Sequence, residues 1–470
     1  MLKYTYSPLG MTIILRGYVA FHFIIFAQYL SRNFFVFLEF SAGFFGGSAY
    51  FFISISVRGD LPMSIISLAG MLLIFAAAFW LLSKEDLLDS VPRTVVCTAL
   101  LLSSLLFRLN FFDHQTYDYR DFLQPWIQFF TDNGGFYALR YPIGNYNVPY
   151  LYFLALFSYF DPSDWLYLIK LLSVAFDVLC AYAVLKLVSL YTDSKPRLLI
   201  AFFGILFLPT VVLNGSVWGQ CDVIYAAFGV YGLYLALTDR PIPAMICFAA
   251  SFAVKLQAVF LLPIIAVLWY RNHFKLWHSL IFPAAYVVIV LPAVLMGRPF
   301  WDTVTLYLNQ TGSIGSGLNY NSSSVFAYFP NESAMDVEFW SNMGVVLAFA
   351  FMIAVLLWLF TKRKQLTKEI VLAAALLLCL GIPFILPHMH DRYFFVADVL
   401  SLAFAVVFPK LFAVPLLVQF GSLLGYHAYL KLQYLLPMRH GATALLITLV
   451  LLTAFIIYQF HTKNEHKKNA

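Results

Sequence analysis

The sequence predicts an all-α fold, a polytopic bundle of transmembrane helices. First, 62% of the 470 residues are hydrophobic and only 11% are charged, whereas a soluble domain has about 25% charged residues. Second, apolar runs of roughly 20 residues, the length that crosses a bilayer as a helix, follow one another along the chain. Third, the polar residues gather in a few loops. A soluble fold of this length would need more polar surface, which excludes a cytosolic enzyme, a nucleic-acid-binding module and a disordered chain.

The apolar runs predict about 13–15 spans. The full-length runs lie near residues 11–30, 34–57, 62–82, 92–109, 165–190, 198–214, 222–238, 276–296, 341–361, 369–387, 393–408, 411–430 and 441–460. The region 242–270 differs, because it is too long for one helix and too short for two, and Lys255 and Gln257 lie at its middle. Irregular backbone at membrane depth needs protein or a wet cavity around it, so we expect two half-length helices that meet at Lys255.

Lysines and arginines in short loops orient the helices, because cytoplasmic loops are enriched in them. The most basic loop is 362–368, and the C-terminal tail is basic as well. Alternation from these loops places two long loops on the outer side, 110–164 and 297–340. It also places two short polar clusters there, 218–222 and 388–392. Every polar cluster that could support chemistry is therefore expected on one face of the membrane.

The first long outer loop has three carboxylates just past a membrane exit. They are Asp113, Asp118 and Asp121, and aromatic residues such as Tyr119 and Trp126 lie among them. One interpretation is a carboxylate held above the bilayer as a general base. The alternative is a solvated loop with an interfacial belt of aromatic side chains.

Farther along this loop, residues 125–133 have the amphipathic pattern of a helix that lies on the membrane surface. Pro125 suits its first turn, and the pair Gly134-Gly135 is expected to end it. The apolar run 148–160 is too short to span the bilayer, so we expect it to fold back along the interface.

The cluster 214–222 contains Trp218, Gln220 and Asp222 at the outer start of a helix. An indole face with an amide and a carboxylate could bind a sugar in a small pocket. Alternatively, Asp222 is a helix N-cap.

Lys255 lies in an apolar run with Gln257 two residues on. A lysine at membrane depth is costly and by default marks a functional cavity or a buried partner. The alternative is a side chain that reaches to the interface.

The segment 387–393 contains His388, His390 and Arg392. The favoured interpretation is anion binding, in which Arg392 forks onto a phosphate and His390 donates a second hydrogen bond. Two alternatives are a metal site formed by the His-x-His pair and a charge cluster that anchors the next helix. The second long loop, 297–340, is expected to cover the outer cavity, with Arg298 as a further cation.

Five short motifs carry a resemblance to a known family. They are YDYRDFLQPW at 117–126, VPYLY at 148–152, VWGQCD at 217–222, KLQ at 255–257 and HDRYFF at 390–395. In this order the chain resembles the membrane-embedded GT-C glycosyltransferases, especially the bacterial branch related to the Gpi18/PIG-V mannosyltransferases.

The resemblance implies an inverting transfer of a hexose, with mannose as the first candidate, from a polyprenyl-phosphate carrier to an acceptor hydroxyl. It implies that a loop aspartate deprotonates the acceptor, which matches Asp118 best, with Asp121 in reserve and Asp113 behind it. The carrier phosphate would lie at Arg392 and His390, supported by Lys255. The sugar or substrate contacts that the motifs imply are Trp218, Gln220, Asp222, Gln257, Tyr119 and Trp126.

The motifs cover roughly residues 92–400, which divides the chain into three parts. Residues 1–91 form extra N-terminal helices, 92–400 a GT-C-like module, and 401–470 C-terminal helices with a basic cytoplasmic tail. The partners implied are the lipid-linked donor, a glycan, lipid or protein acceptor, and membrane lipids, with no nucleic acid. The location implied is the cytoplasmic membrane with an outward-facing site, or the endoplasmic reticulum membrane in a eukaryote.

Two points limit the match. Some relatives have an aspartate where this chain has Asn145, which weakens any scheme with a second carboxylate there. Some relatives use a divalent metal, Mg²⁺ or Mn²⁺, and no clear ligand set stands out in this sequence.

Two other functions remain open from the sequence. A flippase or transporter of lipid-linked saccharides would need polar groups in the inner half of the membrane as well, and few are found there. A polysaccharide polymerase or ligase would take an oligosaccharide on a diphosphate carrier.

Overall fold

The computed structural model describes residues 65–271, 274–310, 317–329 and 336–468. The chain divides into two units, residues 1–62 with 88–97 and residues 63–87 with 98–470. Of the first unit, only 88–97 are described, and they include the first turns of helix α4 (Val91–Leu109). The spans expected at 11–30 and 34–57 lie outside the described residues. The account below concerns the second unit.

The all-α prediction is confirmed, because the described residues fold into helices and one two-stranded sheet. Eight helices among them are long and apolar enough to cross a membrane, or nine when one bent pair is included. The eight are α3 (Ile65–Lys84), α4, α7 (Trp165–Val188), α13 (Ile281–Leu295), α16 (Val337–Thr361), α17 (Lys368–Ile385), α19 (Ala413–Lys431) and α20 (Arg439–Lys468).

Every apolar run expected within the described residues forms a helix, although two of the runs expected at full length give shorter helices and one is bent. The runs at 222–238 and 393–408 become helices α10 (Asp222–Leu237) and α18 (Phe395–Val407), of 16 and 13 residues. The run at 198–214 is the bent pair, α8 (Lys195–Leu206) followed by α9 (Pro209–Val212) and a π-helix, η4 (Leu213–Trp218). Its bend of 40° lies at Leu208, which is extended because a residue before proline is forced out of the helical region.

The break at Lys255 is confirmed. Helix α11 (Pro241–Val254) ends there, Lys255 is extended with φ −153° and ψ 136°, and the chain continues as a 3₁₀ turn, η5 (Leu256–Phe260), and α12 (Ile264–Tyr270). The two half-length helices leave the lysine side chain free to point sideways into the bundle.

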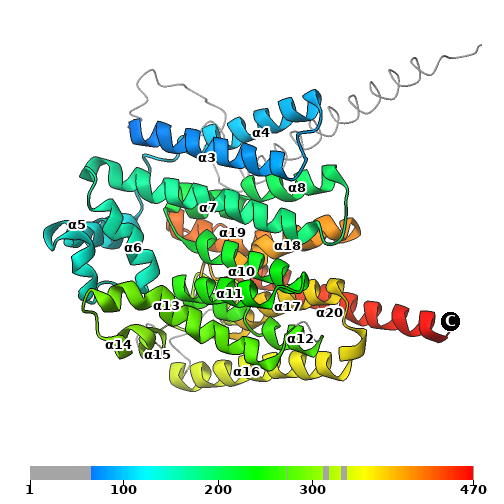
Figure 1. The fold of residues 1–470 in the computed structure, drawn as a ribbon. Helices are drawn as coiled ribbons and strands as arrows, with labels where there is room; N and C mark the ends of the chain where they lie inside the picture. The colour runs from blue at the N-terminus through cyan, green and yellow to red at the C-terminus, as the bar shows by residue number, and fades with distance from the viewer. Residues whose placement is uncertain (1–64, 272–273, 311–316, 330–335, 469–470) are drawn as a thin grey trace, which may run out of the picture. The chain divides into compact units, whose positions relative to one another are not determined.

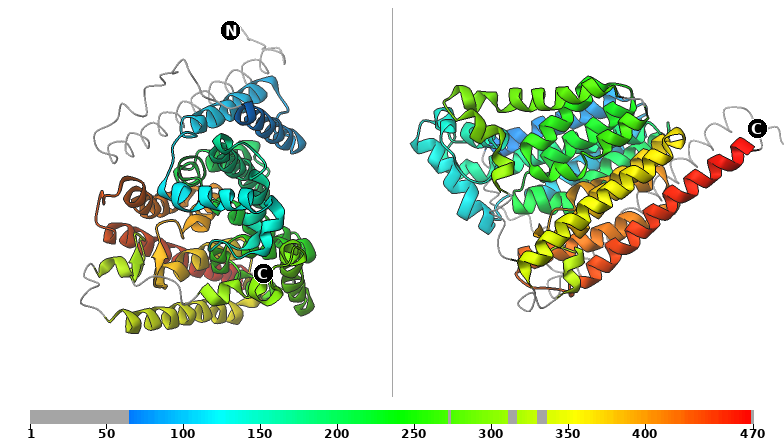
Figure 2. Two further views of the ribbon diagram at one scale, coloured as in Figure 1. Left: turned by 90° about the vertical axis from the view of Figure 1, so that its left-hand side faces the viewer. Right: turned by 90° about the horizontal axis from the view of Figure 1, so that it is seen from below.

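The long helices of this unit run roughly parallel to one another, and the short helices of the loops 110–164 and 297–340 gather at one end of them (Figure 1). These short helices are α5 (Gln124–Asp132), α6 (Val148–Phe157), α14 (Phe300–Val304) and α15 (Leu306–Gln310). Helix α17 lies in the core, because 83% of its apolar stretch is buried. Helix α16 lies at the periphery, because only 22% of its apolar stretch is buried. Helix α20 packs against α17 and α19 (Figure 2), and its Phe460 ring lies 5.8 Å from the Trp358 ring of α16.

The basic loops meet at the end of the bundle away from these short helices. The Tyr191 hydroxyl, which follows α7, donates to the Lys368 carbonyl at 2.9 Å. The Tyr270 ring at the end of α12 contacts that of Phe360 at 5.0 Å. The loops that follow α7, α12 and α16 are therefore neighbours, as alternation of the spans requires.

The remaining short elements lie in the loops 110–164 and 297–340 and in the connections between the long helices. Helix α5 has Pro125 in its first turn and is followed by Gly134 with φ +86° and Gly135 with φ +64°, as expected. The other short elements are η1 (Tyr119–Leu123), η2 (Gly135–Arg140), η3 (Pro162–Asp164), η6 (Leu276–Leu280), η7 (Val325–Tyr328), η9 (Arg363–Gln365) and η10 (Pro409–Leu411).

A two-stranded parallel sheet joins the loop 297–340 to the segment 388–392. Strand β1 (Asn319–Tyr320) pairs with β2 (Met389–His390), with Tyr320 opposite His390. The loop is therefore attached directly to the predicted phosphate-binding segment.

Candidate functional site

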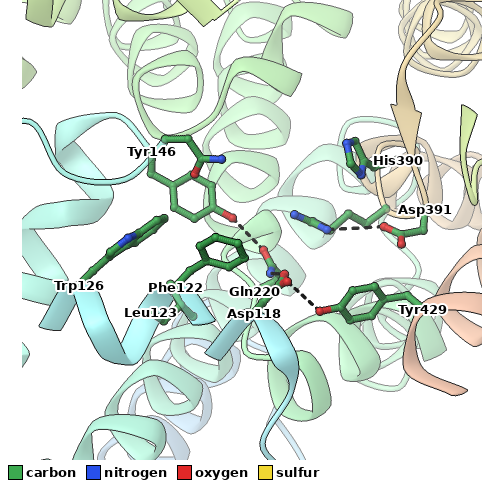
Figure 3. Close-up of a pocket in the computed structure, with 11 residues that line it drawn as sticks. Asp118, Phe122, Leu123, Trp126, Tyr146, Gln220, His390, Asp391 and Tyr429 are labelled. Atoms are coloured by element: carbon green, nitrogen blue, oxygen red, sulfur yellow. Dashed lines mark hydrogen bonds and ion pairs between the residues drawn. The ribbon is translucent and has the colours of Figure 1, made fainter. Parts of the chain in front are cut away.

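Most of the predicted site residues gather around one cavity of about 250 Å³ (Figure 3). Five segments of the chain that are distant in sequence contribute to its wall. Its lining residues are Asp118, Phe122, Leu123, Trp126, Asn145, Tyr146, Gln220, His390, Asp391, Arg392 and Tyr429.

Asp118 lies half-buried at this wall, just before η1, and accepts three hydrogen bonds. The indole Nε1 of Trp218 and the amide Nε2 of Gln220 both donate to Oδ2, at 2.9 and 2.5 Å. The Tyr429 hydroxyl donates to Oδ1 at 2.7 Å. Hydrogen bonds to an ionised carboxylate are strong, so the three donors fix its orientation toward the cavity.

The loop that carries Asp118 is held by side chains of helix α7. The buried ammonium of Lys170 donates to the carbonyls of Phe111 and His114, at 2.5 and 2.7 Å. The Tyr167 hydroxyl donates to Asp113 at 2.5 Å. Asp113, the least favoured candidate for the base, is thus engaged outside the cavity.

The π-helix η4 and the turn after it present Trp218 and Gln220. Gly219 has φ +80°, in the left-handed region that favours glycine, so the chain turns sharply between the two side chains. The Thr116 hydroxyl donates to the Trp218 carbonyl at 3.0 Å, which ties this turn to the Asp118 loop. The Trp218 ring stacks on Tyr429, with centroids 3.8 Å apart and an interplanar angle of 13°.

Behind this wall, Asp222 is buried and holds two cations. It forms ion pairs with Lys255 and with Nε of Arg392 at 3.4 Å, and accepts a hydrogen bond from Asn214 at 2.7 Å. Arg392 also lies 4.8 Å from the centre of the Trp218 ring, a cation–π contact. Asp222 therefore positions both cations, and it is not the N-cap that was the alternative, because Cys221 takes that position and Asp222 is the first residue of α10.

Asp391 and His390 face the cavity beside Arg392. Burial raises the pKa of Asp391 to about 7, helped by the carboxylates of Asp118 and Asp222 and opposed by Arg392. Burial and the neighbouring cation Arg392 lower the pKa of His390 to about 4, so its ring is neutral at neutral pH. That ring stacks on Tyr320, with centroids 4.7 Å apart.

The structure places the sequence-predicted residues at different distances from the cavity. Asp118, Trp126, Gln220, His390 and Arg392 line it. Three others lie behind the lining residues and contact them. Trp218 bonds to Asp118, Asp222 pairs with Arg392, and Lys255 lies 5.4 Å from the centre of the Tyr146 ring.

Three other predicted residues are not among those that line the cavity. Asp121 is exposed on η1. Tyr119 is buried in the packing of η1, and Gln257 is buried against Tyr393.

Among the lining residues that the sequence analysis did not predict are three with ionisable side chains, Tyr146, Asp391 and Tyr429. Asp391 lies between the predicted site residues His390 and Arg392, and Tyr146 follows Asn145 in the same loop. Their neighbours in the sequence could therefore have indicated both residues. Tyr146 donates to Oε1 of Gln220 at 3.0 Å. Nothing in the sequence indicated Tyr429, because it belongs to an apolar helix outside the predicted module. Only the fold brings it to the cavity.

Within the described part of the chain, no group of three or more His, Cys, Asp or Glu side chains could hold a metal ion. His388, part of the His-x-His pair, instead bonds to Ser341 at 2.8 Å and to the Gly317 carbonyl at 2.6 Å.

Comparison with known families identifies a match over the middle of the chain. The model of glycosyltransferase family 87 matches residues 145–387, which is more than half of the chain. No curated protein matches the chain.

Proposed function

Because the chain belongs to glycosyltransferase family 87 and is therefore a glycosyltransferase, we propose that it transfers a hexose from a polyprenyl-phosphate carrier to an acceptor hydroxyl with inversion. The observation that supports this proposal is that an oriented carboxylate, Asp118, and a guanidinium, Arg392, line the same cavity. Inverting transfer needs a base on one side of the sugar ring and stabilisation of the leaving group on the other.

Asp118 is the base in this scheme. Its carboxylate removes the proton of the acceptor hydroxyl as that oxygen attacks the anomeric carbon, a contribution of about 10²–10⁴-fold in rate. Two of its three hydrogen bonds hold Oδ2, which leaves Oδ1 with one donor and a lone pair for the acceptor.

The leaving group is the carrier phosphate. As the new carbon–oxygen bond forms, the bond from the anomeric carbon to the phosphate oxygen breaks and its electron pair stays on the phosphate. Arg392 stabilises that charge, so no general acid is needed. Neutral His390 can donate one hydrogen bond, and Lys255 acts through Asp222 by holding the arginine in place.

The size and lining of the cavity favour a single sugar on a lipid carrier. Pockets for drug-sized ligands measure about 300–1,000 Å³. A cavity of about 250 Å³ suits one hexose better than the oligosaccharide diphosphate of a polymerase or ligase. Trp126 offers a ring face to the sugar, and Phe122, which is 49% exposed, offers apolar surface to the first carrier units.

The finer assignments rest on the resemblance described above. Its Gpi18/PIG-V-related branch makes mannose the first hexose to test. The basic loops at the opposite end of the bundle favour an outward-facing site in the cytoplasmic membrane, or a lumenal site in the endoplasmic reticulum. The acceptor is a glycan, lipid or protein hydroxyl.

The test is transfer by the purified protein in lipid nanodiscs, with polyprenyl-phosphate mannose as donor and membrane extracts as acceptor. We expect a new glycosidic bond whose anomeric configuration, read by NMR, is opposite to that of the donor. Asp118→Asn should lose at least about 100-fold in rate, because the base is removed and the shape kept. Asp121→Asn, three residues on and exposed, is the matched variant and should keep its activity.

Three outcomes would contradict parts of this proposal. Full activity of Asp118→Asn would remove Asp118 from its role. Retention of configuration would exclude direct displacement. Translocation of the donor without a new glycosidic bond would favour the flippase, which membership in a glycosyltransferase family disfavours.

A further inference from the structure

The charges around the cavity are unfavourable for an anionic substrate. Three carboxylates, Asp118, Asp222 and Asp391, lie close together with two cations, Lys255 and Arg392. His390 is neutral at neutral pH. If all three carboxylates were ionised, the cluster would have one excess negative charge, and a phosphodiester would bring another.

The three carboxylates differ in how well their charge is stabilised. Asp118 has three hydrogen-bond donors, and Asp222 has two cations and an amide. Asp391 is buried, with 4% of its side chain exposed, and its Oδ1 lies 3.5 Å from Nη1 of Arg392. Asp391 is therefore the carboxylate that gains a proton at least cost.

Two atoms at this point lack hydrogen bonds. Among the described residues, neither Oδ1 of Asp391 nor Nε of Arg392 has a hydrogen-bond partner, although both are buried. Both residues line the cavity. A buried polar atom without a partner destabilises the site, and a ligand with hydrogen-bonding oxygens can relieve that cost.

We propose that Asp391 binds the donor phosphate as a neutral carboxylic acid, donating its O–H to a non-bridging phosphate oxygen while Arg392 pairs with the phosphate charge. This inference rests on the proposed polyprenyl-phosphate donor and assigns a binding residue to it. Where Asp391 is ionised in the free site, it takes up one proton from solvent when the phosphate binds and releases it when the phosphate leaves.

The surroundings of Asp391 from every packed segment fit this role. Arg392 favours its ionised form, while Asp118 and Asp222 favour its neutral form, and burial acts in the same direction as the two carboxylates. Helix α19 contributes Gly425, where a Cβ would lie 2.9 Å from the Asp391 carbonyl. The other titratable groups that face the site are Lys255, His390, Tyr146 and Tyr429.

Because binding requires the protonated form of Asp391, the affinity for the phosphate falls as the pH rises through the pKa of Asp391, which is about 7. Below that pH the acid is already neutral, so affinity is constant. Above it the free site must gain a proton before it binds, so affinity falls by up to about tenfold per pH unit.

The experiment measures binding of methyl polyprenyl phosphate to the full-length protein in nanodiscs. This phosphodiester keeps a single charge between about pH 5.5 and 9, so the ligand does not titrate. Calorimetry on the wild type should show the fall above pH 7. Asp391→Asn, whose amide donates a hydrogen bond without a charge, should bind with an affinity that is constant across this range.

Two controls complete the design. Asp132→Asn, at an exposed aspartate of α5, should behave like the wild type. Asp391→Leu has no donor and should bind more weakly than Asp391→Asn at every pH.

The outcomes separate this inference from the proposed function. Wild-type affinity that does not change with pH, or a pH dependence that survives in Asp391→Asn, would overturn the role of Asp391 and leave the donor class intact. Absence of binding at every pH by protein with normal thermal unfolding would overturn the donor class and this inference with it.

Discussion

The Tyr429 hydroxyl is the best place to test whether orientation of Asp118 matters for the reaction. Tyr429→Phe keeps the ring that stacks on Trp218 and removes only the donor at 2.7 Å from Oδ1. The two donors that remain both hold Oδ2, so the carboxylate can turn about that oxygen. A hydrogen bond to a charged group contributes about 1.5–3 kcal/mol, so kcat should fall roughly 10- to 150-fold.

The assay is steady-state transfer from the lipid-linked donor in nanodiscs, with kcat and KM measured separately. We expect KM for the donor to stay near the wild-type value, because the phosphate contacts are untouched. Tyr458→Phe, at an exposed tyrosine of α20, is the control and should be fully active. Wild-type kcat in Tyr429→Phe, or an effect confined to KM, would refute the argument that this hydroxyl positions the base.

Two further substitutions test how the site is built. Lys170→Met removes both hydrogen bonds from the buried ammonium to the loop that carries the base, and should lower kcat by about tenfold or more in the same assay, with little change in donor KM. Gly425→Ala would place a Cβ 2.6 Å from the Asn321 carbonyl and 2.9 Å from the Asp391 carbonyl, so activity and unfolding temperature should both fall. Gly204→Ala, which meets only a leucine side chain, should keep its activity.

The sequence predicted the fold well where one physical rule dominated. Lys255 in an apolar run predicted a broken helix, and the break occurs there because the ammonium pairs with Asp222 inside the bundle. The bend at Leu208 was missed, although Pro209 was a visible signal. The helices predicted at 222–238 and 393–408 begin at Asp222 and Phe395, immediately after the segments that contribute Gln220 and Arg392 to the site.

For the site, the sequence indicated which motifs come together but not their contacts. Alternation of the spans puts Asp118 and Arg392 on one face of the membrane, and the structure places them at one cavity. The contact of Tyr429 with Asp118 joins residues 311 positions apart, which no periodicity can report. Pairing of Tyr320 with His390 was hidden for the same reason, because a two-residue parallel strand leaves no pattern.

The central claim is that the donor lies between Asp118 and Arg392. A cryo-EM structure of Asp118→Asn with polyprenyl-phosphate hexose tests it most directly, because the variant binds the donor without consuming it. The account predicts density for the phosphate at Arg392 and Asp391, with the anomeric carbon facing residue 118. A donor bound elsewhere, with this cavity closed to it, would contradict the account.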